Sequence, residues 1–379
     1  MNKTKILFAG DFVITDEFKN NNLIDESVMQ LFEEADYRIV NLEAPITPDD
    51  PSNKIIKTGP HLRSSVDTTA PYLKQLKINA VTLANNHILD YGEVGLEDTL
   101  EFCKENGIQT VGAGKDFAKS TKPLRKEIDG KIFSFINFAE NEWASAMCNT
   151  GGAHPMDIID NANLVKFEKE EVDIVIVIIH GGHEYYHYPS PRMKKQYRFY
   201  AEMGADIIIG HHTHCIGGYE VYKETPIFYS LGNFLFTKHS DFDNWYKGLV
   251  VKIEISKTHE ISFDLIPSKQ RKEDFYLETQ TGIEKKMTFI DVDNINKTIL
   301  VDSLLREKWD EFIKERNNLY IMSISPLNRY KYKLIKAIIY KSGIYKKIFN
   351  IEYTKRLLNA IRCESHKDAI CNILYNQIK

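Results

Sequence analysis

The sequence predicts an α/β protein whose strands and helices form layers around a mixed sheet. Apolar strand-like segments alternate with helix-like segments over the first two-thirds of the chain. Two segments, 173–180 and 205–211, each contain a run of β-branched apolar residues that stops at a histidine, which is typical of strands buried on both faces. A third stretch, 219–265, reads as a series of antiparallel strands. Alternating elements followed by a β-rich stretch favour a layered domain with a mixed sheet.

The elements of the first half follow from local signals. Four short strands are expected at residues 5–9, 37–40, 80–84 and 108–111. The helices between them are expected at residues 23–35, 66–77 and 93–106. Pro71 restricts where the second helix can begin, and Gly107 closes the third. Asp129-Gly130 predicts a hairpin over 124–138, and a helix at about 191–203 separates the two β-branched strands.

The pattern changes after about residue 270. Residues 297–316 and 330–376 are helix-like and rich in Lys, Ile, Leu and Tyr. We therefore expect an α/β domain over 1–270 and a mostly helical extension over 271–379. Residues 328–379 carry 12 basic and 3 acidic side chains, a net charge of +9, whereas the preceding residues sum to −13.

The basic extension has two interpretations. It could contact an anionic membrane surface, where each Lys or Arg contributes about 1 kcal/mol, or it could pack against the acidic body. The helical spacing of Leu334, Ile335, Ile338 and Ile339 favours packing. Nucleic-acid binding is not expected, because neither aromatic nor Gly-rich motifs accompany the charge.

Composition indicates an ordinary soluble globular protein, with 43% hydrophobic and 27% charged residues. No apolar run approaches the roughly 18 residues that span a bilayer, and the apolar stretch after Lys5 is too short for a secretory signal. Five scattered cysteines without a C-x-x-C motif argue against a disulfide scaffold or a cysteine zinc site. A cytoplasmic location, with peripheral membrane contact through the extension, is the expectation.

Potential metal ligands follow strand after strand. Any one of them alone is weak evidence, because a polar residue after a strand is usually part of a turn. Together they provide two carboxylates, an amide oxygen and several imidazoles, at Asp11, Glu43, Asn86, His180, His212 and His214. Mixed oxygen and nitrogen donors suit one or two divalent ions such as Mn, Fe or Zn better than Ca or Mg alone. If His212 and His214 lie on a strand, both rings share one face.

This ligand set predicts a chemistry. Two ions about 3.5–4 Å apart would clamp a phosphate and lower the pKa of a bridging water from ~15.7 towards ~7. The leaving group also needs a proton, which His87 could supply. Asp90 could orient His87, or it could instead cap the helix that follows.

The order of the blocks GD, NLE, NNHxxDYG, VGAG, HGGHEY, GADIIIGHHTH and YSLGNFLF, within about residues 5–255, resembles a known family. The family that it resembles is that of the CapA-like bacterial capsule-synthesis proteins, which are associated with poly-γ-glutamate. These proteins belong to the calcineurin-like metallophosphoesterase superfamily. The resemblance implies a four-layer αββα sandwich with metal ligands at strand ends. It also implies that Glu43 bridges two metals and that His87 is the catalytic histidine.

The resemblance extends to neighbouring positions. It implies that His211 is a ligand or supports one, and that Glu184 is the acidic residue of the family's His-Trp-Gly-x-Glu block. Asn233 could line the pocket or belong to a tight turn between strands. Gly181 stands where the family usually has Trp, so Tyr185 or Tyr186 would have to supply the aromatic wall. The superfamily's early Asp-x-His is absent, which leaves one of the two metal sites short of a ligand.

Two functions remain open from the sequence. The first is a metal-dependent hydrolase of capsule or poly-γ-glutamate biosynthesis, acting on a phosphate ester or a related bond of an anionic polymer or a phosphorylated small molecule. The second is a non-catalytic component that holds a polymer or a capsule-assembly protein. Gly181 and the basic extension favour the second slightly.

Overall fold

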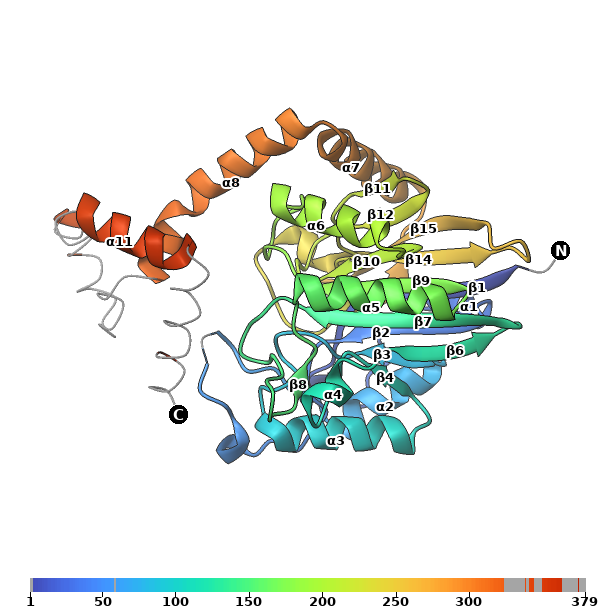
Figure 1. Cartoon of the computed structure of the whole chain (residues 1–379). Helices are drawn as coiled ribbons and strands as arrows, with labels where there is room; N and C mark the ends of the chain where they lie inside the picture. Colours follow the sequence, from blue (N-terminus) through green and yellow to red (C-terminus); the bar gives the residue numbers. More distant parts are fainter. Residues whose placement is uncertain are drawn as a thin grey trace. The chain divides into compact units, whose positions relative to one another are not determined.

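The computed structural model describes residues 3–57, 59–323, 338, 341–343, 350–362 and 374. The chain forms two compact units, one ending at Trp309 and the other beginning at Asp310. The first unit contains two large sheets and the helices that cover them (Figure 1). The division into domains at residue 270 stays a prediction, and the first unit continues past that residue.

The larger sheet has eight strands in the order β16-β15-β14-β1-β2-β3-β4, with β13 also paired to β1. Its first four strands along the chain are β1 (Thr4–Val13), β2 (Tyr37–Leu42), β3 (Ala80–Thr82) and β4 (Gln109–Val111). Its remaining strands are β13 (Asn233–Phe236), β14 (Lys247–Ile255), β15 (Ile261–Gln270) and β16 (Leu277–Thr279). Strands β1 to β4 run parallel, so their carboxyl ends share one edge.

The smaller sheet has six strands in the order β11-β12-β10-β9-β7-β6. Its strands are β6 (Leu124–Ile128), β7 (Lys131–Ala139), β9 (Ile174–His180), β10 (Ile207–His211), β11 (Tyr219–Tyr222) and β12 (Thr225–Phe228). The central strands β7, β9, β10 and β12 are parallel. A separate two-stranded sheet consists of β5 (Ala113–Gly114) and β8 (Gly152–Ala153).

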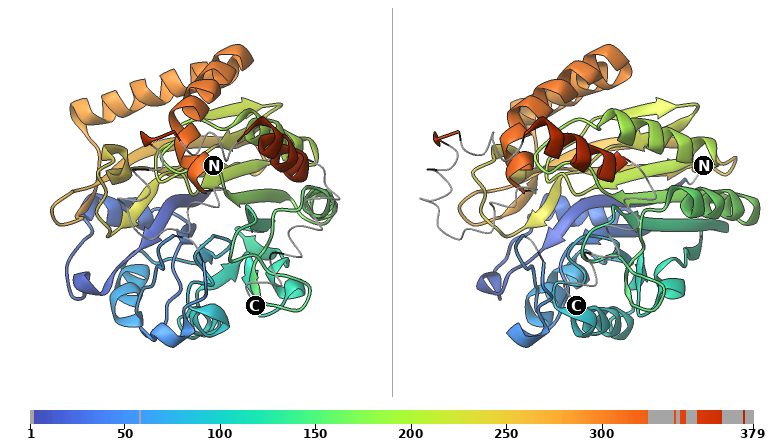
Figure 2. Two further views of the ribbon diagram at one scale, coloured as in Figure 1. Left: turned by 90° about the vertical axis from the view of Figure 1, so that its left-hand side faces the viewer. Right: turned by 60° about the vertical axis from the view of Figure 1, so that its left-hand side comes forward.

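Helices cover the outer face of each sheet. On the larger sheet they are α1 (Glu26–Glu33), α2 (Val66–Gln75) and α3 (Gly92–Glu105). On the smaller sheet they are α5 (Ile158–Glu171) and α6 (Pro191–Glu202). Short α4 (Phe117–Ser120) follows β5, and α7 (Gly282–Leu300) lies beside β11. Figure 2 shows the two sheets stacked between these helical layers, which confirms the four-layer αββα architecture.

Strand periodicity builds this sandwich. In β1, Ile6 and Phe8 point into the core between the sheets, whereas Leu7 and Ala9 face α1 to α3. In β9, Ile176 and Ile178 belong to the same central core, and their neighbours pack against α5 and α6. Successive side chains on a strand alternate between faces, so unbroken apolar runs are what two buried faces require.

One local expectation needs correction, and two details of the helices were not anticipated. Strand β12 is antiparallel to β11 but parallel to β10, and β13 is parallel to β1, so the stretch 219–265 is mixed rather than antiparallel throughout. Helix α5 was not expected, because its apolar spacing is weak. Pro71 lies inside α2 rather than at its start; Ser65 and Thr68 form a capping box at that end.

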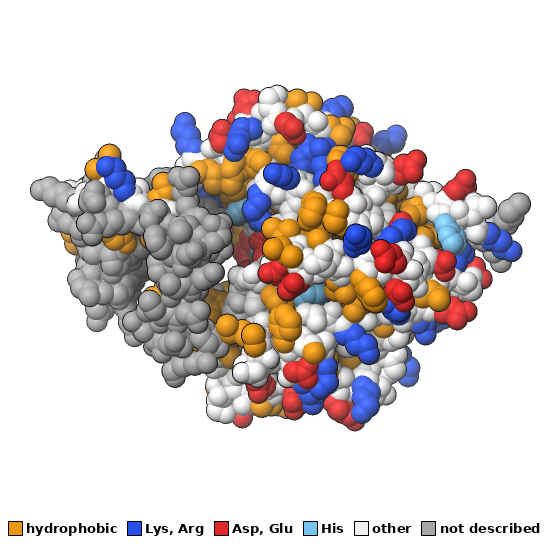
Figure 3. All heavy atoms as spheres, in the orientation of Figure 1, with side chains coloured by type: hydrophobic (Ala, Val, Ile, Leu, Met, Phe, Trp, Pro, Cys, Tyr) orange, Lys and Arg blue, Asp and Glu red, His pale blue; other side chains and the backbone are white. Residues whose placement is uncertain are grey.

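The second unit contains the end of α8 (Asp302–Ser323) and α11 (Ile351–Arg362). Most of the helix expected at 330–376 lies outside the described residues. Among the helices that are described, none combines the length and apolarity needed to cross a bilayer. On the face of the molecule in Figure 3, acidic and basic side chains are interspersed rather than segregated.

Candidate metal centre

The carboxyl ends of parallel strands from both sheets meet at one place and bring the expected ligands together. Asp11 lies on β1, Glu43 follows β2 and Asn86 follows β3, all from the larger sheet. His180 and His211 end β9 and β10 of the smaller sheet and are paired in register. Strand ends in open α/β sheets are the usual position of ligand sites.

Asp11 is placed by an irregularity in β1. The register of β1 shifts between Ala9 and Asp11 against β2, and between Asp11 and Phe12 against β13. A Cβ atom at Gly10 would lie 1.9 Å from the carbonyl oxygen of Gly232, so only glycine permits this approach of the backbones. The backbone N–H of Asp11 donates to that same carbonyl at 3.1 Å, which fixes the buried carboxylate at the sheet edge.

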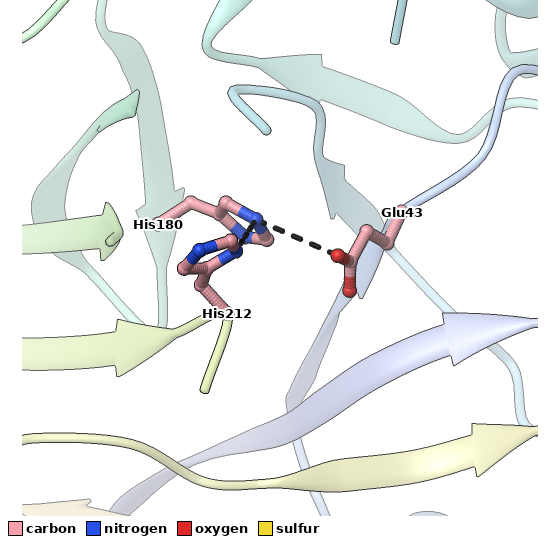
Figure 4. Close-up of side chains that lie close together, drawn as sticks. All are labelled: Glu43, His180 and His212. Carbon is pink, nitrogen blue, oxygen red and sulfur yellow. Dashed lines mark hydrogen bonds and ion pairs between the residues drawn. The ribbon is translucent and has the colours of Figure 1, made fainter. Parts of the chain in front are cut away.

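A first group of ligand atoms belongs to Glu43, His180 and His212 (Figure 4). His180 Nε2 lies 3.6 Å from Glu43 Oε1 and 3.0 Å from His212 Nδ1. Asn86 Oδ1 lies 3.1 Å from the same His180 nitrogen. Two imidazoles, one carboxylate and one amide oxygen therefore converge on a single point, in the combination expected for a transition-metal ion.

A second group consists of Asp11, Glu43 and His214. His214 Nε2 lies 3.7 Å from Glu43 Oε1, and His214 Nδ1 lies 3.4 Å from Asp11 Oδ2. His211 Nδ1 lies 3.4 Å from the other Asp11 oxygen. Glu43 belongs to both groups, and its Oε1 atom lies 3.6 Å from His180 Nε2 of the first and 3.7 Å from His214 Nε2 of the second.

Among the residues that the structure describes, four of the buried polar atoms without a hydrogen-bond partner lie at this place. Both oxygens of Glu43, Asp11 Oδ2 and His211 Nδ1 are buried and make no hydrogen bond. A buried polar group without a partner costs about 1–3 kcal/mol, and more when it is charged. The residues therefore fit divalent cations, which would satisfy these oxygens and offset the repulsion between the two carboxylates.

The pKa values in the site diverge. Burial raises the pKa of Glu43 well above its usual value, and the negative charge of Asp11 adds to this. Burial would also raise the pKa of Asp11, but the rings of His211 and His214, each with Nδ1 3.4 Å from an Asp11 oxygen, outweigh it and hold that pKa well below its usual value. Burial lowers the pKa of His180, which keeps its ring neutral and able to bind a metal.

The histidine pair converges by a different route from the one expected. Strand β10 ends at His211, so His212 and His214 lie on the turn that follows. Their φ angles are +94° and +55°, a left-handed backbone that is uncommon outside glycine. The condition for two rings on one strand face is therefore not met, and the turn instead brings the two rings to a centroid distance of 6.1 Å.

His87 lies beside the ligands and is held by Asp90. His87 Nδ1 lies 2.6 Å from Asp90 Oδ2, and the His87 backbone N–H donates to Asn85 Oδ1 at 3.0 Å. Helix α3 begins at Gly92 with Tyr91 at its N-cap, so Asp90 is not the cap of that helix. Burial is the largest cause that lowers the pKa of His87, and the charge of Lys57 adds to it although Asp90 acts in the opposite sense.

Lys57 is the main residue that sequence analysis missed. Its side chain is only 3% exposed, forms an ion pair with Asp90, and brings Nζ within 3.2 Å of His87 Nδ1. The segment around it carries no motif, and no local signal marks the lysine. Asn41, within the NLE block, was also missed; its Nδ2 donates to Asp11 Oδ1 at 2.7 Å and lies 3.3 Å from His180 Nδ1.

The remaining expected residues frame the site. Asn233 Oδ1 lies 3.0 Å from His214 Nδ1, so Asn233 positions that ring. Glu184 is exposed, and its charge acts on both Glu43 and His214. The aromatic wall consists of Tyr185 and the unanticipated Trp245, whose rings lie 6.3 and 4.7 Å from that of His214.

A charged side chain lies against Gly181, the position where the resemblance implies Trp. A Cβ atom at Gly181 would lie 2.7 Å from Glu140 Cγ. Glu140 in turn forms an ion pair with Arg192 on α6. A larger residue at Gly181 would therefore displace Glu140, and this part of the wall is polar rather than aromatic.

Comparison with known proteins gives consistent matches. A model of the family described as bacterial capsule synthesis protein PGA_cap matches residues 5–238. The PGA biosynthesis protein CapA of Bacillus subtilis (strain 168) is 34% identical over 239 residues, which are 60% of this chain and 62% of that protein. The capsule biosynthesis protein CapA of Bacillus anthracis is 32% identical over 209 residues, 53% of this chain and 51% of that protein. The chain thus spans between half and two-thirds of the length of these relatives.

Among solved structures, the NAD nucleotidase (NadN) of Haemophilus influenzae aligns with a TM-score of 0.44 at 13% identity. The alignment covers 84% of this chain and 68% of that chain.

Proposed function

This chain belongs to the bacterial capsule synthesis protein PGA_cap family, and from that premise we propose that it is a metal-dependent hydrolase of capsule biosynthesis. The bond cleaved is a phosphate ester or a related bond. The substrate that carries this bond is an anionic polymer such as poly-γ-glutamate, or a phosphorylated small molecule. The observation that carries this proposal is the pair of overlapping ligand groups that share Glu43, beside a buried His87–Asp90 pair.

Divalent ions such as Mn, Fe or Zn, one or two in number, would supply an activated water and neutralise the charge of the reacting group. One ion would be held by Asn86, His180, His212 and Glu43. The other would be held by Asp11, His214 and the same Glu43. The second set has three donors, with His211 close by, and would hold its ion more weakly than the first set.

The protein's own residues would manage the proton of the leaving group. Asp90 holds Nδ1 of His87 and leaves Nε2 as the nitrogen available to a substrate. General acid catalysis of this kind contributes about 10²–10⁴-fold. Lys57 shares Asp90 with His87 and would add a positive charge beside the ring that we propose as the acid. Tyr185 and Trp245 would limit the access of bulk water beside His214.

The test combines metal content with hydrolysis. Purified protein should contain a transition metal by plasma mass spectrometry, and it should hydrolyse p-nitrophenyl phosphate or bis-p-nitrophenyl phosphate when Mn²⁺ is added. His212→Ala should lower both the metal content and the rate. Metal without turnover on any phosphoester would overturn the hydrolase and leave a binding site.

A second candidate function is a non-catalytic component that holds a polymer or a capsule-assembly protein through the same pocket. The polar wall made by Glu140 at Gly181 favours it, because it departs from the family's aromatic wall. A binder of this kind would keep its affinity for poly-γ-glutamate after His87→Ala, whereas a hydrolase would lose its turnover.

We also propose that the chain acts in the cytoplasm and that its second unit contacts an anionic membrane surface. Helix α11 exposes Ile351, Leu358 and Ile361 at 76%, 50% and 57%, spaced so that they share one face. The segment 328–379 that contains this helix carries a net charge of +9. An exposed apolar face within a basic segment fits a helix lying on anionic lipid. A hydrophilic polyanion would use the charge but not the apolar face.

A further inference from the structure

A groove of about 320 Å³ lies behind the loop that follows β9, outside the metal centre. One side comes from the part of the chain that matches the family, through His187, Tyr188 and Ile216. The other side lies beyond residue 238, in the short helical turn before β14, at the first residue of β14, and in α7. These residues are Asn244, Lys247, Thr288, Asp291, Val292, Asn294 and Ile295. The groove therefore depends on a part of this chain that the family model does not cover.

The α7 wall of the groove is fixed by close packing. A Cβ atom at Gly218 would lie 2.6 Å from atoms of Ile295 and Asn296, so glycine lets the helix approach β11 (Figure 1). Asn296 Oδ1 accepts the backbone N–H of Tyr219 at 2.6 Å. Val292 and Ile295 are buried against the smaller sheet and the central core. A preformed wall of this kind is usual in small-molecule sites, and the volume falls within their range.

The floor of the groove is a fixed neutral imidazole. His187 Nδ1 lies 2.8 Å from the carbonyl oxygen of Ile216, and Asn244 Nδ2 donates to His187 Nε2 at 3.0 Å. Since Nε2 accepts, Nδ1 carries the proton and donates to that carbonyl. Burial lowers the pKa of His187, which agrees with a neutral ring. The ring therefore positions the Asn244 amide and carries no charge of its own.

Two opposite charges face this floor without neutralising each other. Lys247 and Asp291 both act on the pKa of His187, in opposite directions. Within the described residues neither of them forms an ion pair or a side-chain hydrogen bond, although both line the groove. Asp243, the other acidic residue near Lys247, is paired with Lys272. The groove thus offers one free cation, one free anion and the side-chain amides of Asn244 and Asn294 beside an apolar surface.

We propose that this groove binds a zwitterionic α-amino-acid group, with the ligand carboxylate at Lys247 and its ammonium at Asp291. The identity of the ligand rests on the proposed role in poly-γ-glutamate biosynthesis. In a γ-linked chain, only the residue at the amino end keeps both a free α-ammonium and a free α-carboxylate. The groove would therefore hold that chain end, or free glutamate, while the remaining units lead away from it. The groove and the metal centre are close along the chain. Ile216 of the groove comes two residues after His214 of the metal centre, and His187 of the groove comes two residues after Tyr185, which lies beside His214.

The experiment measures binding of γ-glutamyl-glutamate to the full chain by calorimetry, with EDTA present so that the metal centre does not compete. Glutarate, which lacks the ammonium, should bind at least about tenfold more weakly, because a site that pairs a charge rejects ligands lacking it. Asp291→Asn and Lys247→Met should each weaken binding of the dipeptide by a similar factor. Asp293→Asn and Lys297→Met alter exposed α7 residues that do not line the groove, and they should leave binding unchanged.

Several results would overturn the inference. They are no binding of the dipeptide at about 10 mM, equal binding of glutarate, or wild-type binding by both groove variants. Loss of binding in His212→Ala with retention in Asp291→Asn would place the ligand at the metal centre instead. Thermal melts of each variant exclude misfolding as the cause. Dipeptide binding without any hydrolase activity would contradict only the proposed function. Hydrolysis without dipeptide binding would contradict only the proposed ligand of the groove.

Discussion

His87 Nδ1 lies 2.6 Å from Asp90 Oδ2, and both side chains are buried beside the ligand cluster. The Asp90 carboxylate also pairs with Lys57 and accepts the backbone N–H of Leu62 at 2.6 Å. One carboxylate therefore fixes the ring, a lysine and a loop at once. This arrangement separates the residue proposed to move a proton from the residues proposed to hold metal, and it makes the two roles separable by mutation.

Replacing the proposed acid should abolish turnover without removing metal. For His87→Ala we expect kcat to fall by about 10²–10⁴-fold, because the leaving group would depart without a proton. Metal content should remain at the wild-type value, since Asn86 and His180 keep their positions. The matched control is His259→Ala in the exposed hairpin between β14 and β15. Loss of metal together with turnover would assign His87 to the ligands instead.

Removing the lysine that shares Asp90 should change the pH profile. Lys57 lowers the pKa of His87, so Lys57→Met is expected to raise that pKa. If His87 acts as the acid, the fall in rate at high pH should move to higher pH. Lys54→Met, an exposed lysine on the same loop, serves as the control. An unchanged pH–rate profile in Lys57→Met would contradict the coupling of these three residues.

The carboxylate of Glu43, which belongs to both ligand groups, should stabilise the protein only when metal is present. In EDTA at pH 8, Glu43→Gln should raise the free energy of unfolding by roughly 1–3 kcal/mol, because it removes a buried, unpaired carboxylate next to Asp11. In the wild type, added Mn²⁺ should raise the melting temperature, and the variant should lose this response. Differential scanning calorimetry with and without metal measures both effects. Destabilisation of the variant in EDTA would show that Glu43 has an unrecognised partner.

His154 should make the folded state sensitive to mild acid. Its ring is 3% exposed, and its nitrogens lie 3.0 Å from the Asn137 carbonyl oxygen and 2.9 Å from Asn161 Oδ1. Burial lowers its pKa from 6.5 to about 4. Between these values the unfolded chain takes up a proton that the folded chain excludes. The stability that the neutral ring contributes is therefore complete above pH 6.5 and is lost as the pH falls through about 4.

The size of this effect can be isolated by mutation. Over this pH range the wild type should lose about 3 kcal/mol more than His154→Gln, in proportion to the difference in pKa. Urea unfolding of both proteins at pH 7, 5.5 and 4 provides the comparison. Carboxylates that titrate in both proteins contribute equally to the two free energies of unfolding, so their effect cancels in the difference. Parallel pH dependences would show that the ring is protonated in the folded state.

Membrane contact should depend on the apolar face of α11. The full chain is expected to bind vesicles that contain phosphatidylserine and not vesicles of phosphatidylcholine alone, and added salt should weaken binding. Leu358→Ser should lower the partition coefficient by about tenfold, because it removes buried apolar surface. Thr354→Ser on the same helix is the control. Unaltered vesicle binding by Leu358→Ser, or preference for soluble poly-γ-glutamate, would indicate a purely electrostatic surface.

The sequence by itself determined the layered architecture and most of the ligand set. The β-branched runs that end at His180 and His211 predicted strands buried on both faces, and the alternation of β9 between two cores has that origin. Asp11, Glu43 and Asn86 were found because each comes shortly after a strand expected from the sequence, although β1 in fact continues through Asp11 to Val13. These are local signals, since a strand and the residue after it are neighbours in the chain.

Only the tertiary structure decided which further side chains share the site. Lys57 reaches Asp90 across 33 positions, and Trp245 lies against His214 across 31, and no sequence pattern links either pair. The histidine turn was likewise missed, because its left-handed backbone depends on what surrounds it. The groove beside α7 exists because a helix outside the family match packs on Gly218. The stacking of the layers decides which distant segments come into contact. The local sequence of a segment shows only whether that segment forms a strand or a helix and which of its faces is buried.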